Sequence, residues 1–70
     1  DLSDSPRKSN LIYLIVTAIF VGILWDGYNT VKNNSNSQPI DIQKAYKNLV
    51  AILLLFLGTS INFDVLNNNY

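Results

Sequence analysis

Two acidic positions at the margins of apolar runs carry the sharpest local chemistry in this sequence. Asp26 is followed by Gly27 at the end of the first apolar run. A carboxylate there could hold a metal ion or an arginine of a partner. The alternative is a solvated acidic residue at a helix end, where the last backbone groups need only water or a cap. We favour the solvated helix end, with Gly27 ending or loosening the helix.

Asn62 and Asp64 form the second candidate pair. Either could serve as an axial oxygen ligand to a chlorophyll magnesium or as part of a proton path, because ionisable residues inside membranes usually have a function. Trp25 is a third candidate for contact with a cofactor. Asp64, however, lies near the expected end of the second apolar run, so we favour plain solvation at an interface.

The residue types that the chain lacks argue against catalysis. It contains no Cys and no His, and all five of its acidic residues are aspartates. The sequence therefore predicts no catalytic residue, no metal site and no cofactor that is certain to be its own. The formal net charge is zero, so no basic excess favours nucleic acid as a partner. The aspartates are scattered at the margins of the apolar runs: Asp1, Asp4, Asp26, Asp41 and Asp64.

The charged residues are segregated from two apolar runs. No charge lies between Lys8 and Asp26, which predicts a polar N-terminal segment at 1–10 and a transmembrane helix at 11–28. About 20 residues are needed to cross a hydrocarbon core about 30 Å thick. Trp25 and Tyr28 would then lie at one interface, where amphipathic rings prefer to be.

The second run predicts a second helix. We expect a polar loop at 29–38, an interfacial helix start and transmembrane helix at 39–66, and a polar tail at 67–70. Pro39 suits a first helical position, and Asp41 in the first turn complements the helix dipole. A re-entrant segment is the alternative, because the strictly aliphatic stretch, residues 49–57, is short.

The fold class that follows is all-α, a membrane-spanning helical hairpin of two transmembrane helices joined by a polar loop. Apolar side chains surround the first helix, so it has no polar face for water. A signal peptide is disfavoured because bulky residues, Trp25 to Tyr28, stand where a cleavage site would need small ones. Because the chain opens with Asp1, we expect that a leader was removed or that a longer chain was trimmed.

Small and hydroxylated residues are the candidates for helix packing. Lipid tails are as apolar as leucine, so close approach and polar contacts must hold helices together in a bilayer. Ala18 and Gly22 form a small-xxx-small pair that could bring the two helices together or dock one of them on a partner. Thr59 and Ser60 can return their hydroxyl bonds to their own helix. The packing candidates are Ala18, Gly22, Gly58, Thr59 and Ser60.

The layout resembles a small two-helix membrane family of uncharacterised function from cyanobacteria and plastids. The resemblance covers residues 5–66. It rests on Ser5-Pro6-Arg7 before the first helix, on Pro39-Ile40 after a polar loop, and on a later Gly58-Thr59. Unlike that family, this chain turns polar at Asn62. The resemblance implies a plastid thylakoid location and an accessory role beside photosystem I, as in red-lineage algae, with chlorophyll or carotenoid at the surface of the chain.

Three functions therefore compete. The first is a small non-catalytic accessory subunit at the periphery of a thylakoid photosynthetic complex, photosystem I favoured, which stabilises the complex or helps to position pigments and lipids. The second is a supernumerary subunit of a respiratory or ATP-synthase complex in the mitochondrial inner membrane. The third is a holin-like pore-forming hairpin, ranked last because holins normally end in a basic tail. The expected partners are membrane lipids, a larger membrane protein complex and pigments.

Overall fold

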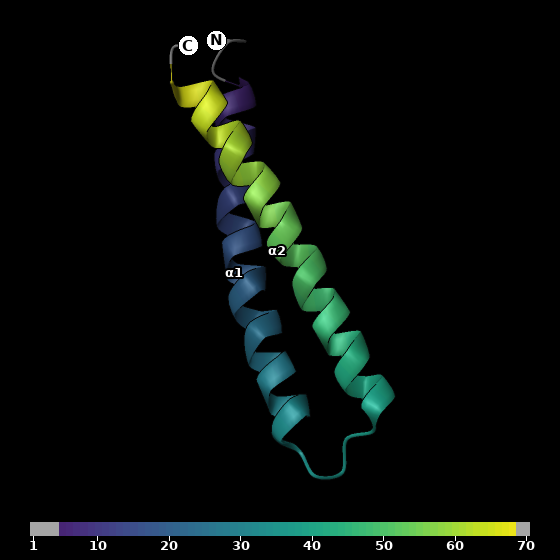
Figure 1. Ribbon diagram of the computed structural model, residues 1–70. Coiled ribbons are helices and arrows are strands. Elements are labelled where there is room, and N and C mark those ends of the chain that lie inside the picture. Colours follow the sequence, from purple (N-terminus) through teal and green to yellow (C-terminus); the bar gives the residue numbers. More distant parts are fainter. Residues whose placement is uncertain (1–4, 69–70) are drawn as a thin grey trace.

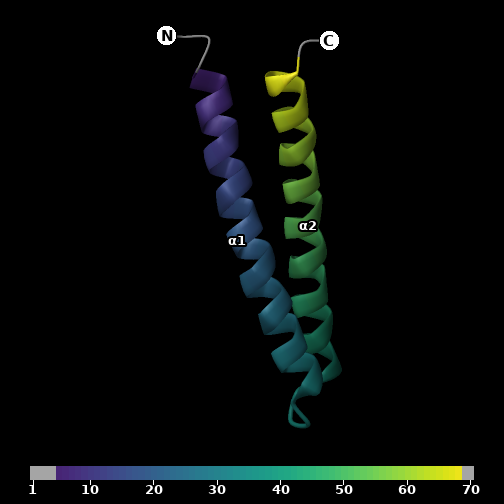
Figure 2. The same ribbon diagram turned by 90° about the vertical axis from the view of Figure 1, so that its left-hand side faces the viewer.

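The protein folds as two long antiparallel α-helices joined by a short turn (Figure 1). The computed structural model describes residues 5–68. Helix α1 spans Ser5–Asn33 and helix α2 spans Pro39–Asn67. Together they make a rod of 53 × 18 × 13 Å. The first turn of α1 and the last turn of α2 lie at the same end of the rod, as both views show (Figures 1 and 2).

Helix α1 is longer than its expected membrane span, and this corrects the predicted loop. It takes in residues 29–33, which the sequence analysis assigns to the loop. Polar side chains in this stretch bond back to the helix: the Asn29 amide donates to the Trp25 carbonyl oxygen at 3.1 Å, and the Thr30 hydroxyl donates to that of Asp26 at 2.9 Å. Of the two roles expected for Gly27, ending or loosening the helix, the first is wrong, because α1 continues to Asn33 and Gly27 has no positive φ.

The turn between the helices is confined to residues 34–38 and is held by local hydrogen bonds. The Asn34 side-chain oxygen accepts from the Asn36 backbone N–H at 3.0 Å, an arrangement typical of Asx turns. The Ser37 backbone N–H donates to the Asn34 carbonyl at 3.1 Å. This turn reverses the chain within a few residues and brings the two helices side by side.

The predicted start of α2 is confirmed. Gln38 has an extended backbone, and Pro39 opens the helix at a position where a missing N–H costs nothing. The Asp41 carboxylate accepts a hydrogen bond from the Gln38 backbone N–H at 3.2 Å. At the other end α2 continues to Asn67, where the Asn68 N–H closes the last turn onto the Asp64 carbonyl at 3.0 Å. Asn69, Tyr70 and residues 1–4 lie outside the described residues.

The two helices meet along a narrow seam. Most of the less exposed residues of each helix, apart from Asn29, Val50 and Ser60, recur at alternating intervals of three and four, an average of 3.5 that is typical of coiled-coil packing. We call this set the seam. On α1 it comprises Asn10, Leu14, Thr17, Val21, Leu24, Tyr28 and Val31; on α2 it comprises Ile42, Ala45, Leu49, Ile52, Phe56, Thr59, Phe63 and Leu66.

Most of the apolar surface lies outside this seam. Leu49, at 4% exposure, is the one buried hydrophobic residue among those described. In the most apolar part of each helix only 6% of the residues are buried, whereas the core helix of a soluble protein would be mostly buried. The chain is therefore all-helical, with two helices that are long and apolar enough to cross a membrane and that point their large side chains outward.

Candidate functional site

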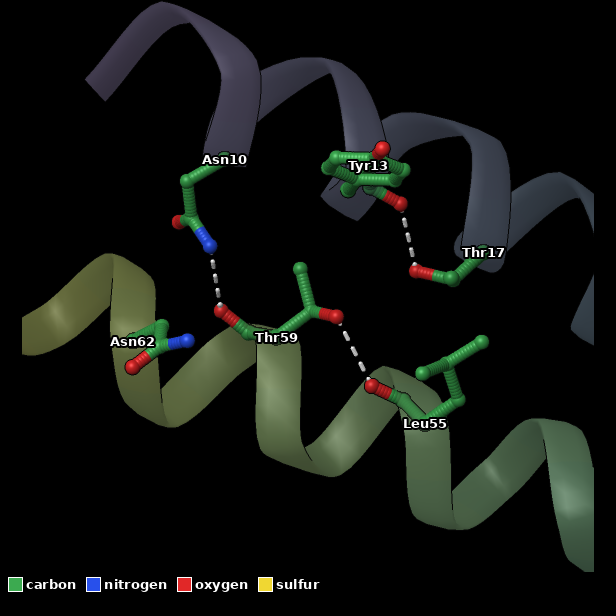
Figure 3. Close-up of a pocket in the computed structure, with 6 residues that line it drawn as sticks. All are labelled: Asn10, Tyr13, Thr17, Leu55, Thr59 and Asn62. Carbon is green, nitrogen blue, oxygen red and sulfur yellow. Dashed lines mark hydrogen bonds between the residues drawn. The ribbon is translucent and has the colours of Figure 1, made fainter. Parts of the chain in front are cut away.

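A polar contact joins the two helices near their terminal ends. The side-chain Nδ2 of Asn10 donates to the backbone carbonyl oxygen of Thr59 at 3.3 Å (Figure 3). Both residues are only 9% exposed. A buried amide that crosses from one helix to the other fixes the register of the pair, because sliding by one residue would leave its donor without an acceptor.

The other buried polar groups of the seam are satisfied within their own helices. Thr17 is only 3% exposed. Its hydroxyl donates to the backbone carbonyl oxygens of Tyr13 at 2.7 Å and of Leu14 at 3.1 Å. The Thr59 hydroxyl donates to Leu55 at 2.8 Å, and that of Ser60 to Phe56 at 2.9 Å. The predicted back-bonding of Thr59 and Ser60 is confirmed.

Among residues 5–68, one buried polar side-chain atom has no such partner. The side-chain oxygen Oδ1 of Asn10 is buried and accepts no hydrogen bond. A buried unsatisfied acceptor costs about 1–3 kcal/mol, and each such atom in a native protein calls for an explanation. This atom is therefore the first place to look for a ligand.

Beside the Asn10–Thr59 contact runs a shallow groove of about 270 Å³ between the helices. It is lined by uncharged residues only, and Figure 3 shows α1 supplying one wall and α2 the other. The amide of Asn62 lies beside Thr59 at one end of this groove (Figure 3). We call this site the polar groove, lined by Asn10, Tyr13, Thr17, Leu55, Thr59 and Asn62.

Aromatic contacts hold the opposite end of the rod. The rings of Tyr28 and Tyr46 pack at a centroid distance of 6.0 Å, tilted by 54°, within the range of favourable aromatic pairs. The Lys32 ammonium nitrogen lies 5.9 Å from the centroid of the Tyr28 ring, a cation–π distance. The Tyr28–Tyr46 pair joins the two helices next to the turn, whereas the Lys32 contact lies within α1, so the hairpin is held at both ends.

Three of the five packing candidates do not bring the two helices together. Ala18, Gly22 and Gly58 are exposed, and a Cβ added at either glycine would meet no atom within 4 Å. Where the two helices contact each other, the small or polar residues are asparagine and threonine, not glycine. Thr59 is in the seam and Ser60 lies half-buried beside it. For Ala18 and Gly22 the other role, docking on a partner, remains a prediction.

The aspartates are not brought together. Asp26, Asp41 and Asp64 are all exposed; Asp41 caps α2, and Asp64 accepts from the Asn68 amide at 2.6 Å. Asp1 and Asp4 fall outside the part of the chain that the structure describes. Within residues 5–68 no three metal-ligating residues gather in one place.

The other cofactor candidates differ in position. Trp25 is 56% exposed on α1, and Asn62 is exposed in the polar groove. No family, curated protein or solved structure matches this chain. Any ligand proposed at Trp25 or Asn62 therefore rests on the chemistry and the surroundings of these two side chains.

Asn10 and Thr17 are the residues that the sequence analysis does not single out. The signal was present: they are seven residues apart, one coiled-coil repeat, and each is the polar exception in an apolar stripe. A repeat of 3.5 residues therefore places both on the contact face.

Proposed function

We propose that this chain is a small non-catalytic accessory subunit that inserts into a membrane as a hairpin and docks laterally on a larger membrane protein complex. The observation that carries the proposal is the outward direction of the large apolar side chains. Ile19 is 58% exposed and Leu54 63% exposed, each at the middle of its helix. Such surfaces require lipid or another apolar protein around them.

The charged residues support the same arrangement. Arg7 and Lys8 precede the apolar part of α1, and Asp64 follows that of α2, so these charges mark the terminal end of the rod. Lys32 and Lys47 mark the other end. A membrane-spanning hairpin needs charged ends in water and apolar helices between them. Its helices also satisfy their own backbone hydrogen bonds, as the hydrocarbon region requires.

Docking is proposed through the small exposed residues. Because burial from water gives helices no driving force inside a bilayer, close backbone approach must supply the attraction. Ala18 and Gly22 lie one turn apart on α1, and Gly58 lies on α2. All three are exposed, so a helix of a partner protein can approach them closely.

Photosystem I in a plastid thylakoid is the complex that we favour. Support comes from the resemblance of residues 5–66 to the two-helix family of cyanobacteria and plastids. Exposed rings such as Tyr13, Phe20 and Trp25 suit contact with chlorophyll or carotenoid as well as with lipid tails. The chain then fills a gap at the edge of the complex and helps to hold pigments and lipids there.

The direct test is purification of the tagged chain from its native membranes in mild detergent. We expect it to sediment with a large complex whose absorption spectrum contains chlorophyll. Co-purification with a respiratory or ATP-synthase complex would instead assign the protein to the mitochondrial inner membrane. Recovery of self-assembled oligomers alone, with loss of membrane integrity, would contradict the accessory role and favour the pore-forming alternative.

Bulky variants test the docking surface. Gly22→Leu and Gly58→Leu place a large side chain where the hairpin itself has open space, so the hairpin should stay intact. Each should reduce the fraction that co-sediments by about tenfold, corresponding to about 1.4 kcal/mol of lost contact. Gly27→Leu is the matched control, because Gly27 also has open space around it but lies beyond the proposed contact. If all three variants bind like wild type, docking does not use these glycines.

A further inference from the structure

We propose that the polar groove binds the free hydroxyl group of an uncharged lipid, with that hydroxyl donating a hydrogen bond to Oδ1 of Asn10. This inference rests on the insertion of the hairpin into a bilayer, which is part of the proposed function, but not on docking to a complex. Its starting point is the one buried side-chain atom among the described residues that lacks a hydrogen-bonding partner.

The unpaired atom sets the chemistry of the ligand. Oδ1 of Asn10 is an acceptor, so its partner must carry an O–H or N–H group. The amide nitrogen of the same side chain already donates to Thr59 across the seam. Water, an amphiphile or a protein side chain can each supply such a donor at this end of the rod, and the apolar wall of the groove favours an amphiphile.

The composition of the groove excludes a charged ligand. None of its six lining residues is charged. A phosphate drawn into the groove would lose its hydration and gain no cation in return. The Leu55 side chain and the Tyr13 ring offer an apolar wall for the glycerol backbone or the upper part of an acyl chain.

The direction of the groove matches the direction of a lipid. Asn10 is two residues from Lys8, about 3 Å along the helix axis, and so lies close to the charged terminal end. Thr17 is seven residues further, about 10 Å toward the middle of the apolar stretch. A lipid whose hydroxyl lies at Asn10 therefore has its chains beside Thr17 and Leu55. This favours a lipid over a polar side chain of a partner helix, whose donor can enter at any depth.

The Asn10 amide is able to turn toward such a ligand. Its bond to Thr59 is 3.3 Å long, beyond the usual 2.7–3.2 Å range and therefore weak. The terminal torsion of asparagine has a broad energy minimum. Figure 3 shows Oδ1 turned away from Thr17 and Leu55, so rotation of the amide toward the groove exchanges this weak bond for one to the ligand.

The test is competition between lipids that differ only at the hydroxyl. The full chain is reconstituted in phosphatidylcholine vesicles with equal amounts of dioleoylglycerol and its O-methyl ether, extracted in mild detergent, and the retained lipids are counted by mass spectrometry. We expect about a two- to tenfold preference for the free hydroxyl, as one hydrogen bond supplies. In Asn10→Leu the preference should fall to about one. Asn29→Leu is the matched control, because Asn29 bonds only within α1 and lies outside the groove.

Each other result overturns a defined part of the inference. Equal retention of the two lipids by wild type, or an unchanged preference in Asn10→Leu, would show that no hydroxyl binds at Asn10. A third arm with phosphatidylglycerol, whose hydroxyl sits on a charged headgroup, should compete poorly; equal competition would contradict the uncharged assignment. A chain that does not float with vesicles would overturn insertion and the lipid site together, whereas flotation without hydroxyl preference overturns the lipid site alone.

Discussion

Asn10 of α1 and the backbone of Thr59 of α2, separated by 49 positions in the sequence, are joined by a hydrogen bond of 3.3 Å across the seam. The bond uses the amide nitrogen of Asn10 and leaves its oxygen unpaired. One side chain thus sets the alignment of the two helices and supplies the acceptor of the polar groove.

The first prediction concerns how much Asn10 stabilises the hairpin. An interhelical hydrogen bond in a membrane is worth about 0.6 kcal/mol on average. Asn10→Leu removes that bond but also removes the unpaired oxygen, so the free energy of unfolding should change by less than about 1 kcal/mol. Unfolding in mixed micelles of increasing denaturing-detergent fraction measures it. A loss above about 2 kcal/mol would mean that Oδ1 has a partner within the hairpin.

The second prediction is that packing at Leu49 matters more than the amide. Leu49 is 4% exposed, the most buried hydrophobic side chain of the described residues. Leu49→Ala leaves a cavity, and cavities cost about 24 cal/mol per Å³. The same unfolding measurement should therefore show a larger loss for Leu49→Ala than for Asn10→Leu. Leu54→Ala, on the exposed face, is the control and should cost little. The reverse order would contradict a seam held by packing.

The third prediction concerns the start of α2. Asp41→Ala removes the carboxylate that accepts from the Gln38 backbone N–H. Loss of one such hydrogen bond costs on the order of 1 kcal/mol, so the backbone amides of Gln38 and of residues 40–42 should exchange hydrogen faster. Amides near Leu55 should be unaffected. Unchanged exchange at Gln38 and at 40–42 would show that Pro39 alone sets this helix start.

The fourth prediction is that no catalytic step depends on the aspartates. Asp26, Asp41 and Asp64 are exposed and lie apart on the two helices. Asp26→Asn, Asp41→Asn and Asp64→Asn, made singly, should leave the turnover of the assembled host complex nearly unchanged. A hundredfold loss in an intact complex, about 2.7 kcal/mol, would reveal a catalytic role.

Sequence patterns predicted the two helices because charge segregation and Pro39 are local signals. The predicted end of the first span follows the interfacial residues Trp25 to Tyr28, whereas α1 continues past them to Asn33, with the Asn29 and Thr30 side chains bonded to carbonyls of their own helix. The contact face was missed for a different reason. Helix pairing depends on which face of each helix packs against the other helix. The amide of Asn10 can cross between the helices only because the Thr59 carbonyl lies opposite it. A count of small residues instead pointed to Gly22 and Gly58, which face outward.

The membrane hairpin requires lipid over its outward face, and thiol labelling measures this directly. Ile19→Cys and Leu54→Cys place a thiol at positions that are 58% and 63% exposed on the chain, so the protein itself does not shield them. Ser35→Cys places one in the exposed turn. A membrane-impermeant reagent applied to open membranes, with both faces accessible, should label position 35 rapidly and positions 19 and 54 only after the bilayer is dissolved by detergent that unfolds the complex. Rapid labelling at 19 or 54 in intact bilayers would contradict the membrane hairpin.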